Sequence, residues 1–295
     1  MSQKNDALIA MLPPPPDLTG WISRTDRHDV AVRSIHPTRI LVVGLASPSA
    51  FSIAAAHPEA EVVGLDEDPT HVDLLSEASR EMDLGNLSLV SAALDDSGKL
   101  SGPFDWIHVP DPLQPTDDEG AAWRALANRL ASEGFLTSRM RSHRQEYWGD
   151  EFREALAILA GSDALPDLDA WMAFGRRLAG DLSRGATRLR AAAQRVETQL
   201  LHAPALAAAL ALLPAGQSYM LDSAHTMLAR AGLVLLGFLN QPDWEPRGIL
   251  ADPEMEALEE ALAPEERYEM ADILRAPDFL LVCGPQRDPE RTLSR

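Results

Sequence analysis

The feature that most constrains the fold is the alternation of short apolar runs with helical segments over residues 39–140. Five runs are rich enough in β-branched or aromatic residues, and short enough, to be buried parallel strands; they span 39–44, 61–66, 87–92 and 104–109, and the fifth starts at Gly134. Helical patterns occupy 49–58, 69–82 and 116–134 between them. Repeated strand–helix–strand units predict an α/β fold with a mostly parallel sheet and right-handed crossovers.

The pattern changes after residue 143, where Ala-, Leu- and Arg-rich helical sequence continues to 213 without a convincing strand. A helix over 221–232, a strand over 233–239, acidic helices and a last strand over 278–284 follow. We therefore expect a seven-stranded sheet with helices on both faces and a helical insertion or cap before the last two strands. The expected divisions are a Pro-rich lead-in (1–36), the core (37–143), the cap (144–231) and C-terminal strands with acidic helices (232–295).

Composition limits the partners and the compartment. The net charge of −19 argues against nucleic acid or an anionic membrane as the main partner. A single cysteine, Cys283, excludes an internal disulfide and a cysteine-based zinc cluster, and it fits a reducing compartment. No signal-peptide core is visible near residue 1, and the most apolar later run is too short to span a bilayer. A cytoplasmic location is expected.

Ligands of open parallel sheets bind beyond the carboxyl ends of the strands, so the residues there are the candidate site. Asp66 ends the second strand, 22 positions after Gly44, where a carboxylate can accept both hydroxyls of a ribose. The alternative is an ordinary surface acid that caps the helix beginning near Thr70. Asp66 together with the Gly44 loop favours the ribose interpretation.

Several common site motifs are absent from the sequence. The loop after Gly44 matches neither G-x-G-x-x-G nor a P-loop, and Ser47 lacks the glycines of a nucleophile elbow. The eight histidines include no pair at i, i+3 or i, i+4, so no metal site is expected.

Two groups of residues are candidates for contact with a substrate. His108 and Asp111 flank the end of the fourth strand, although a structural role for this histidine is the alternative. His143 and Tyr147 follow the fifth strand and could line a pocket for an aromatic or anionic substrate. The same segment could equally be the start of a surface helix with a buried tryptophan.

These segments together resemble class I S-adenosylmethionine-dependent methyltransferases, most closely a bacterial branch with a helical C-terminal or regulatory region. "LVVGLASPSAF" is similar to the family's first loop, "VVGLDEDP" to its second strand, and "GPFDWIHVPDPL" to its fourth. "HTMLARAGLVLLGFL" resembles the family's late helix and strand. The resemblance extends over about residues 37 to 283 and implies a Rossmann-like methyltransferase fold.

The resemblance also implies roles for individual residues. S-adenosylmethionine would be the cofactor, and three strand-end segments would contact it. The methionine part would be contacted by Gly44, Ala46, Ser47 and Ser49, and the ribose by Asp66 and Glu67. The adenine end would be contacted by Ala93, Leu94 and Asp95. His108 and Asp111 would lie beside the transferred methyl group, with His143 and Tyr147 as further catalytic candidates. A substrate nucleophile would displace the methyl group in line, and the protein would supply proximity and orientation.

Four positions depart from the family's pattern and keep two functions open. Val42 replaces the acidic residue before the first glycine, Pro48 and Ser49 replace the later glycines, and Ala93 replaces the aspartate after the third strand. Pro48 fixes φ and removes an amide donor. The first function is a methyltransferase acting on a small molecule or peptide. The alternative is a protein of this fold that no longer binds the cofactor, serving as an accessory or scaffold, or using the pocket for other chemistry.

Overall fold

The computed structural model describes residues 8–18, 20–21, 36–45, 47–94, 96, 100, 102–110, 119–144, 152, 154–156, 158–159, 168–184, 193–194, 197, 218–245, 253–277 and 279–286. Contacts divide the chain into two compact units. Unit 1 comprises Met1–Met140 and Leu221–Arg295, and unit 2 comprises Arg141–Met220. The finer division into lead-in, core, cap and C-terminal part stays a prediction.

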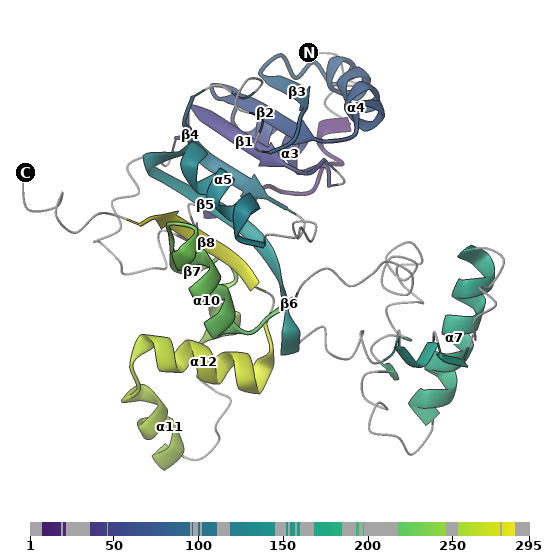
Figure 1. Cartoon of the computed structure of the whole chain (residues 1–295), viewed down its shortest axis with the longest axis vertical. Helices are drawn as coiled ribbons and strands as arrows, with labels where there is room; N and C mark the ends of the chain where they lie inside the picture. Colours follow the sequence, from purple (N-terminus) through teal and green to yellow (C-terminus); the bar gives the residue numbers. More distant parts are fainter. Residues whose placement is uncertain are drawn as a thin grey trace, which may run out of the picture. The chain divides into compact units, whose positions relative to one another are not determined.

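An eight-stranded sheet organises the fold (Figure 1). Its strands are β1 (Arg39–Val43), β2 (Glu61–Asp66), β3 (Leu87–Ser91), β4 (Phe104–Val109), β5 (Leu130–Ser142), β6 (Ser218–Tyr219), β7 (Leu233–Phe238) and β8 (Phe279–Pro285). Seven follow the order β3-β2-β1-β4-β5-β8-β7, and β6 pairs with the end of β5. The mostly parallel sheet is confirmed, with β8 antiparallel to both of its neighbours. Among the strands that the structure describes, the prediction of seven misses β6, because a two-residue strand has no apolar period to detect.

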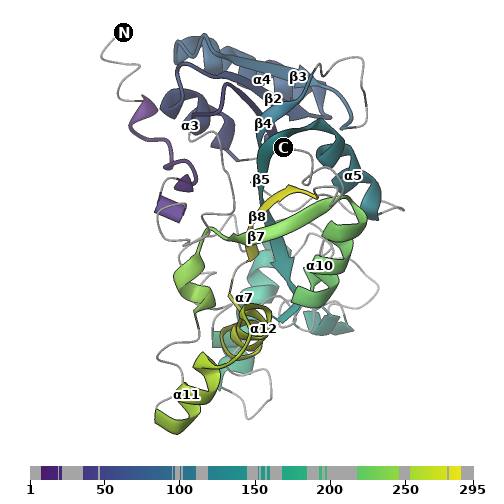
Figure 2. The same ribbon diagram turned by 90° about the vertical axis from the view of Figure 1, so that its left-hand side faces the viewer.

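The crossover helices are α3 (Ser49–Ala56), α4 (Pro69–Glu81) and α5 (Glu119–Arg129). Figure 2 shows α3 on one side of the sheet and α5 on the other. Asp68 is the N-cap of α4, since its side chain accepts the amide of Thr70 at 2.9 Å and Pro69 takes the first helical position. The inner side of α3 packs on buried residues of β1, β2 and β4, including Ile40, Val62 and Trp106.

The boundary between α5 and β5 differs from the prediction. The helical pattern extends to Gly134, whereas the structure ends the helix at Arg129 and begins the strand directly at Leu130. A Cβ at Gly134 would lie 2.9 Å from the main-chain oxygens of both Phe104 and Asp105. This close approach accompanies a register shift in the pairing of β4 with β5, where Phe104 is opposite Leu130 and Trp106 is opposite Phe135. Helix-forming sequence is therefore overridden by pairing with β4, which only a glycine permits at this point.

Four helical elements among the described residues belong to the C-terminal part of unit 1. They are α10 (Leu221–Arg230), the 3-10 turn η1 (Gln241–Trp244), α11 (Pro253–Glu260) and α12 (Pro264–Arg275). The rings of Phe238 and Trp244 stack with centroids 3.6 Å apart, and Tyr268 meets Phe238 edge-on at 5.2 Å. Phe279 of β8 completes this cluster, 5.3 Å from Trp244. An aromatic core thus joins the late strands to α12.

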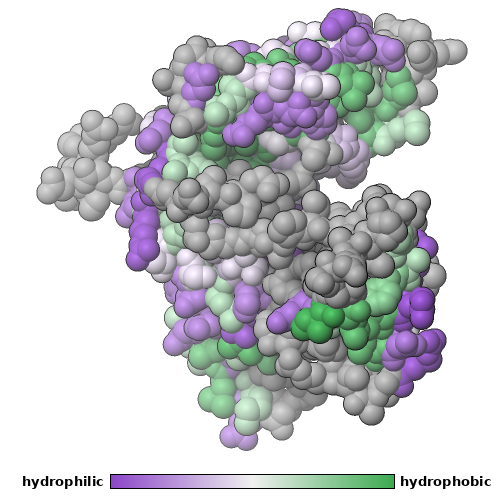
Figure 3. All heavy atoms as spheres, turned by 45° about the vertical axis from the view of Figure 1, so that its right-hand side comes forward, coloured by the Kyte–Doolittle hydropathy of each residue, from purple (hydrophilic) through white to green (hydrophobic). Residues whose placement is uncertain are grey.

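Unit 2 contains α7 (Leu168–Arg184) and β6 among its described residues. Within the ranges that the structure describes, no helix is both long enough and apolar enough to cross a bilayer. Hydrophilic and apolar side chains are interspersed on the face shown in Figure 3.

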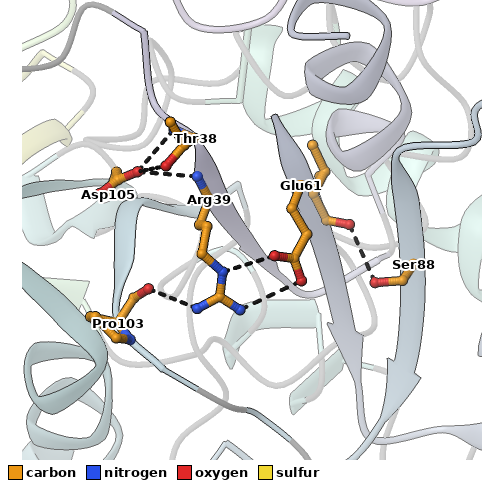
Figure 4. Close-up of polar contacts among 7 residues, drawn as sticks. Thr38, Arg39, Glu61, Ser88, Pro103 and Asp105 are labelled. Carbon is orange, nitrogen blue, oxygen red and sulfur yellow. Dashed lines mark hydrogen bonds and ion pairs between the residues drawn. The ribbon is translucent and has the colours of Figure 1, made fainter. Parts of the chain in front are cut away.

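A polar network ties together the amino ends of β1, β2 and β4 (Figure 4). Asp105 Oδ2 accepts hydrogen bonds from the amide of Thr38 at 2.9 Å, its hydroxyl at 2.7 Å and the amide of Arg39 at 3.1 Å. Burial would raise the pKa of Asp105, but these hydrogen bonds and the Arg39 charge outweigh it and lower the pKa. The Arg39 guanidinium in turn reaches Glu61 at 2.9 Å and the Pro103 carbonyl at 3.1 Å. This network lies at the end of the sheet opposite the candidate site.

Candidate functional site

The carboxyl ends of β1, β2 and β4 lie side by side, because β1 pairs with both of the other strands in parallel. Val42 is in register with Gly64 of β2 and with His108 of β4. Gly44, Asp66 and His108 therefore belong to one edge of the sheet, as the sequence predicts. Ligands of open α/β sheets bind at this edge.

The loop after β1 turns at Gly44. Its φ is +88°, a conformation that glycine adopts without strain, and its amide donates to the Leu65 carbonyl at 2.9 Å. No heavy atom lies within 4 Å of the position that a Cβ at Gly44 would occupy. The backbone thus leaves open space at this turn, which a ligand could approach closely.

The rest of the loop uses no further positive φ among its described residues. Pro48 has φ −72° and stands immediately before α3, where its carbonyl accepts the amides of Phe51 at 3.1 Å and Ser52 at 3.2 Å. The hydroxyls of Ser47 and Ser49 lie 2.7 Å apart. The loop therefore reaches its helix by an ordinary proline-led start rather than by a glycine-rich turn.

Asp66 connects this loop to the start of α4. Its Oδ2 accepts the Leu45 amide at 3.1 Å and lies 3.0 Å from His71 Nδ1, while Oδ1 accepts the Asp68 amide at 3.0 Å. Burial would raise the pKa of Asp66, but the two amides and the His71 contact outweigh it and lower the pKa. The side chain keeps 19% of its surface exposed. An ionised carboxylate with spare acceptor capacity on Oδ1 is thus presented at the sheet edge.

The loop after β3 lies beside Asp66. The Ala92 amide donates to the Asp66 carbonyl at 3.1 Å, and the Asp96 amide closes a turn onto Ala93 at 3.0 Å. Arg129, at the end of α5, donates to the carbonyls of Leu94 at 3.1 Å and Leu100 at 3.0 Å. Ala93 and Glu67 are exposed, so both can contact a ligand.

His108 is buried at the end of β4, with 7% of its surface exposed. Its Nδ1 lies 2.8 Å from the Thr137 hydroxyl, which also accepts the Trp106 indole N–H at 2.8 Å. Burial lowers the pKa of His108 to about 4. A hydrogen bond with the Thr137 main chain raises the pKa, but its effect is smaller than that of burial. The imidazole is therefore neutral at physiological pH.

Four predicted site residues lie outside the described residues: Ala46, Asp95, Asp111 and Tyr147. His143 belongs to unit 2, where its Nδ1 lies 3.1 Å from the Ser218 hydroxyl. Within the described part of the chain, no group of three His, Cys, Asp or Glu side chains could hold a metal ion.

Sequence reasoning missed three residues that hold the site together, namely His71, Arg129 and Thr137. His71 carries a weak signal, since it lies five positions after Asp66 in the first turn of α4. Arg129 and Thr137 carry none, because each reaches its partner from an element 29 or more positions away along the chain.

Comparison with known proteins identifies the fold. The chain is similar to PKMT2 from Rickettsia typhi, with a TM-score of 0.69 and 16% identity, and to the same protein in complex with AdoHcy, with a TM-score of 0.67 and 16% identity. Each match covers 85% of this chain and 49% of the other, so the chain spans about half the length of that protein. No family model and no curated protein sequence matches the chain. The architecture is the Rossmann-like methyltransferase fold.

Proposed function

We propose that this protein is an S-adenosylmethionine-dependent methyltransferase acting on a small molecule or peptide. The observation that carries the proposal is Asp66, an ionised and partly exposed carboxylate at the end of β2, hydrogen-bonded to the loop after β1. The similar PKMT2 structure in complex with AdoHcy supports the same choice of cofactor.

The residues present fit such a cofactor. Asp66 has acceptor capacity for ribose hydroxyls, and the open space at Gly44 admits the methionine part close to the backbone. Ser47, Ser49 and Glu67 would complete these contacts, with Ala93 and Leu94 at the adenine end. The bound cofactor would supply an electrophilic methyl group, and the chain would supply binding and orientation. Ala46 and Asp95 stay proposed cofactor contacts, and Asp111, His143 and Tyr147 stay proposed catalytic residues.

The net charge of −19 supports a small-molecule or peptide substrate over nucleic acid or an anionic membrane. A cytoplasmic location in a bacterium fits the single, buried cysteine. Self-association as a homodimer is part of the proposal and is tested by sedimentation.

A second function is favoured by the same carboxylate. Both oxygens of Asp66 already accept hydrogen bonds from the chain, and Val42 and Pro48 remove contacts that the family's first loop normally provides. A fold that keeps Asp66 only to fix its own loop would serve as an accessory or scaffold protein, or would use the pocket for other chemistry.

Isothermal titration with S-adenosylmethionine and S-adenosylhomocysteine separates the two functions. We expect saturable binding of both ligands by the full chain, with a Kd in the micromolar range. The absence of detectable heat at millimolar ligand, with a folded protein by circular dichroism, would instead support the accessory function.

A further inference from the structure

His108, Thr137 and Trp106 form a buried hydrogen-bonded chain whose proton positions follow from the donors available. The indole N–H of Trp106 can only donate, so it occupies one lone pair of the Thr137 hydroxyl. Thr137 is fully buried, and His108 Nδ1 at 2.8 Å is the partner available to its hydroxyl proton among the described residues. Were Nδ1 protonated, two donors would meet at this hydroxyl and its own proton would be left without an acceptor, which buried hydroxyls avoid.

The second ring nitrogen of His108 then carries the proton. In the part of the chain that the structure describes, Nε2 has no hydrogen-bond partner. It does not belong to the fully buried polar atoms without a partner, so it keeps some accessible surface. It therefore faces space that solvent or a ligand can reach. The neutral state of His108 leaves Nε2 as a donor and gives the ring no free lone pair.

The position of His108 shows which part of the edge this donor serves. Trp106 and His108 share one face of β4, with ring centroids 5.8 Å apart, and Trp106 meets His57 at the end of α3 at 5.7 Å. Since α3 runs antiparallel to the strands, its start at Ser49 lies toward the His108 end of β4. His108 is also in register with Val42, two residues before Gly44.

We propose that His108 is a positioning residue that donates an Nε2–H hydrogen bond to an oxygen of the ligand held by the loop after β1, and that Thr137 and Trp106 fix this tautomer. The proposal rests on the proposed function for the identity of the ligand but not for the tautomer. It also assigns His108 a role other than general base, because Nδ1 is occupied and Nε2 is protonated.

The tautomer is measured without any ligand. Nitrogen-15 NMR of the imidazoles distinguishes a protonated from an unprotonated ring nitrogen, and the His108 signals are assigned by their absence in His108→Gln or, if that variant does not fold, through the backbone. We expect an unprotonated Nδ1 and a protonated Nε2 throughout the range from about pH 5.5 to pH 8. A protonated Nδ1 in the wild type would overturn the proposal.

Matched variants test the role of Thr137. Thr137→Ser keeps the hydroxyl and Thr137→Val keeps the shape without it. The serine variant should retain the wild-type His108 signals, whereas the valine variant should show both tautomers. An unchanged Nε2–H tautomer in a folded valine variant would contradict the role assigned to Thr137.

Titration then tests the donor. Gln at position 108 can place an N–H near the Nε2 position, and Leu cannot. We therefore expect the affinity of His108→Gln for S-adenosylhomocysteine to stay within about threefold of wild type. The affinity of His108→Leu should be at least about fivefold weaker than wild type. 5′-Methylthioadenosine lacks the carboxylate of S-adenosylhomocysteine. If His108→Leu binds it as tightly as wild type does, the carboxylate is the acceptor. If His108→Leu loses as much affinity for it as for S-adenosylhomocysteine, the acceptor is a ribose oxygen. Unchanged affinity of His108→Leu for both ligands would overturn the proposal. Failure of wild type to bind either ligand would refute the proposed function alone and leave the tautomer result standing.

Discussion

At the scale of single residues, Asp66 and Asp105 form a natural pair for comparison. Each is a partly buried carboxylate with a lowered pKa that accepts two main-chain amides, but Asp66 lies at the carboxyl edge of the sheet and Asp105 at the amino edge. Replacing either with Ala should cost about 1–3 kcal/mol of unfolding free energy through lost hydrogen bonds. Only Asp66→Ala should also weaken the binding of S-adenosylhomocysteine, raising its Kd at least about tenfold in titration calorimetry. Equal affinity of the two variants would contradict the ribose role.

His108 also predicts a pH dependence of stability. Its pKa is about 4 in the folded chain against 6.5 for an exposed histidine, so the unfolded chain binds more protons between these values. The folded state therefore loses stability as the pH falls from about 6.5 to about 4, by about 2–3 kcal/mol from this group. Urea unfolding at about pH 7 and pH 4.5 measures this loss. Between these pH values, the unfolding free energy of His108→Gln should fall by about 2–3 kcal/mol less than that of the wild type. Burial lowers the pKa of His57 and His225 as well, so a slope remains in the variant.

At the scale of elements, Gly134 holds β5 against β4. A methyl group at this position would lie 2.9 Å from two main-chain oxygens, which cannot move without breaking the strand pairing. Gly134→Ala should cost about 2–3 kcal/mol in urea unfolding. The control is Gly85→Ala, where no atom lies within 4 Å of the added methyl group, and it should change stability by less than about 0.5 kcal/mol. Equal losses of stability in Gly134→Ala and Gly85→Ala would show that β5 can move to accommodate the added methyl group.

Gly64 of β2 offers an intermediate case. Its added methyl group would meet the flexible end of Leu89 at 2.5 Å rather than main chain. Leu89 can rotate away, so the cost of Gly64→Ala should fall between those of the other two variants.

The same elements show what the sequence could predict. β1, β2 and β4 carry their signal locally, as short apolar runs between turn residues, and their predicted bounds agree with the structure to within a residue. The start of β5 could not be predicted, because Leu130 becomes a strand residue only by pairing with Phe104. The two residues of β6 likewise follow from pairing with Arg141 and Ser142.

At the scale of the whole molecule, the candidate site divides in the same way. The sheet topology places Gly44, Asp66 and His108 at one edge, and the parallel strands expected from the repeated crossovers predict that their carboxyl ends share it. The contacts that fix these residues come from His71, Thr137 and the loop amides, which depend on the folded geometry. The sequence therefore indicates where a ligand binds, and the structure indicates how the side chains are held.

Charge is the property that acts over the whole chain. Acidic residues outnumber basic residues 45 to 26, so self-repulsion opposes the compact state and salt should screen it. We expect the melting temperature of the ligand-free protein to rise by several degrees between about 10 mM and 150 mM sodium chloride, measured by calorimetry at pH 7. Choline chloride at the same ionic strength should give the same rise, because screening depends on ionic strength rather than on the identity of the cation. A melting temperature that falls with salt would show that attractive pairs such as Arg39 with Glu61 outweigh the net repulsion.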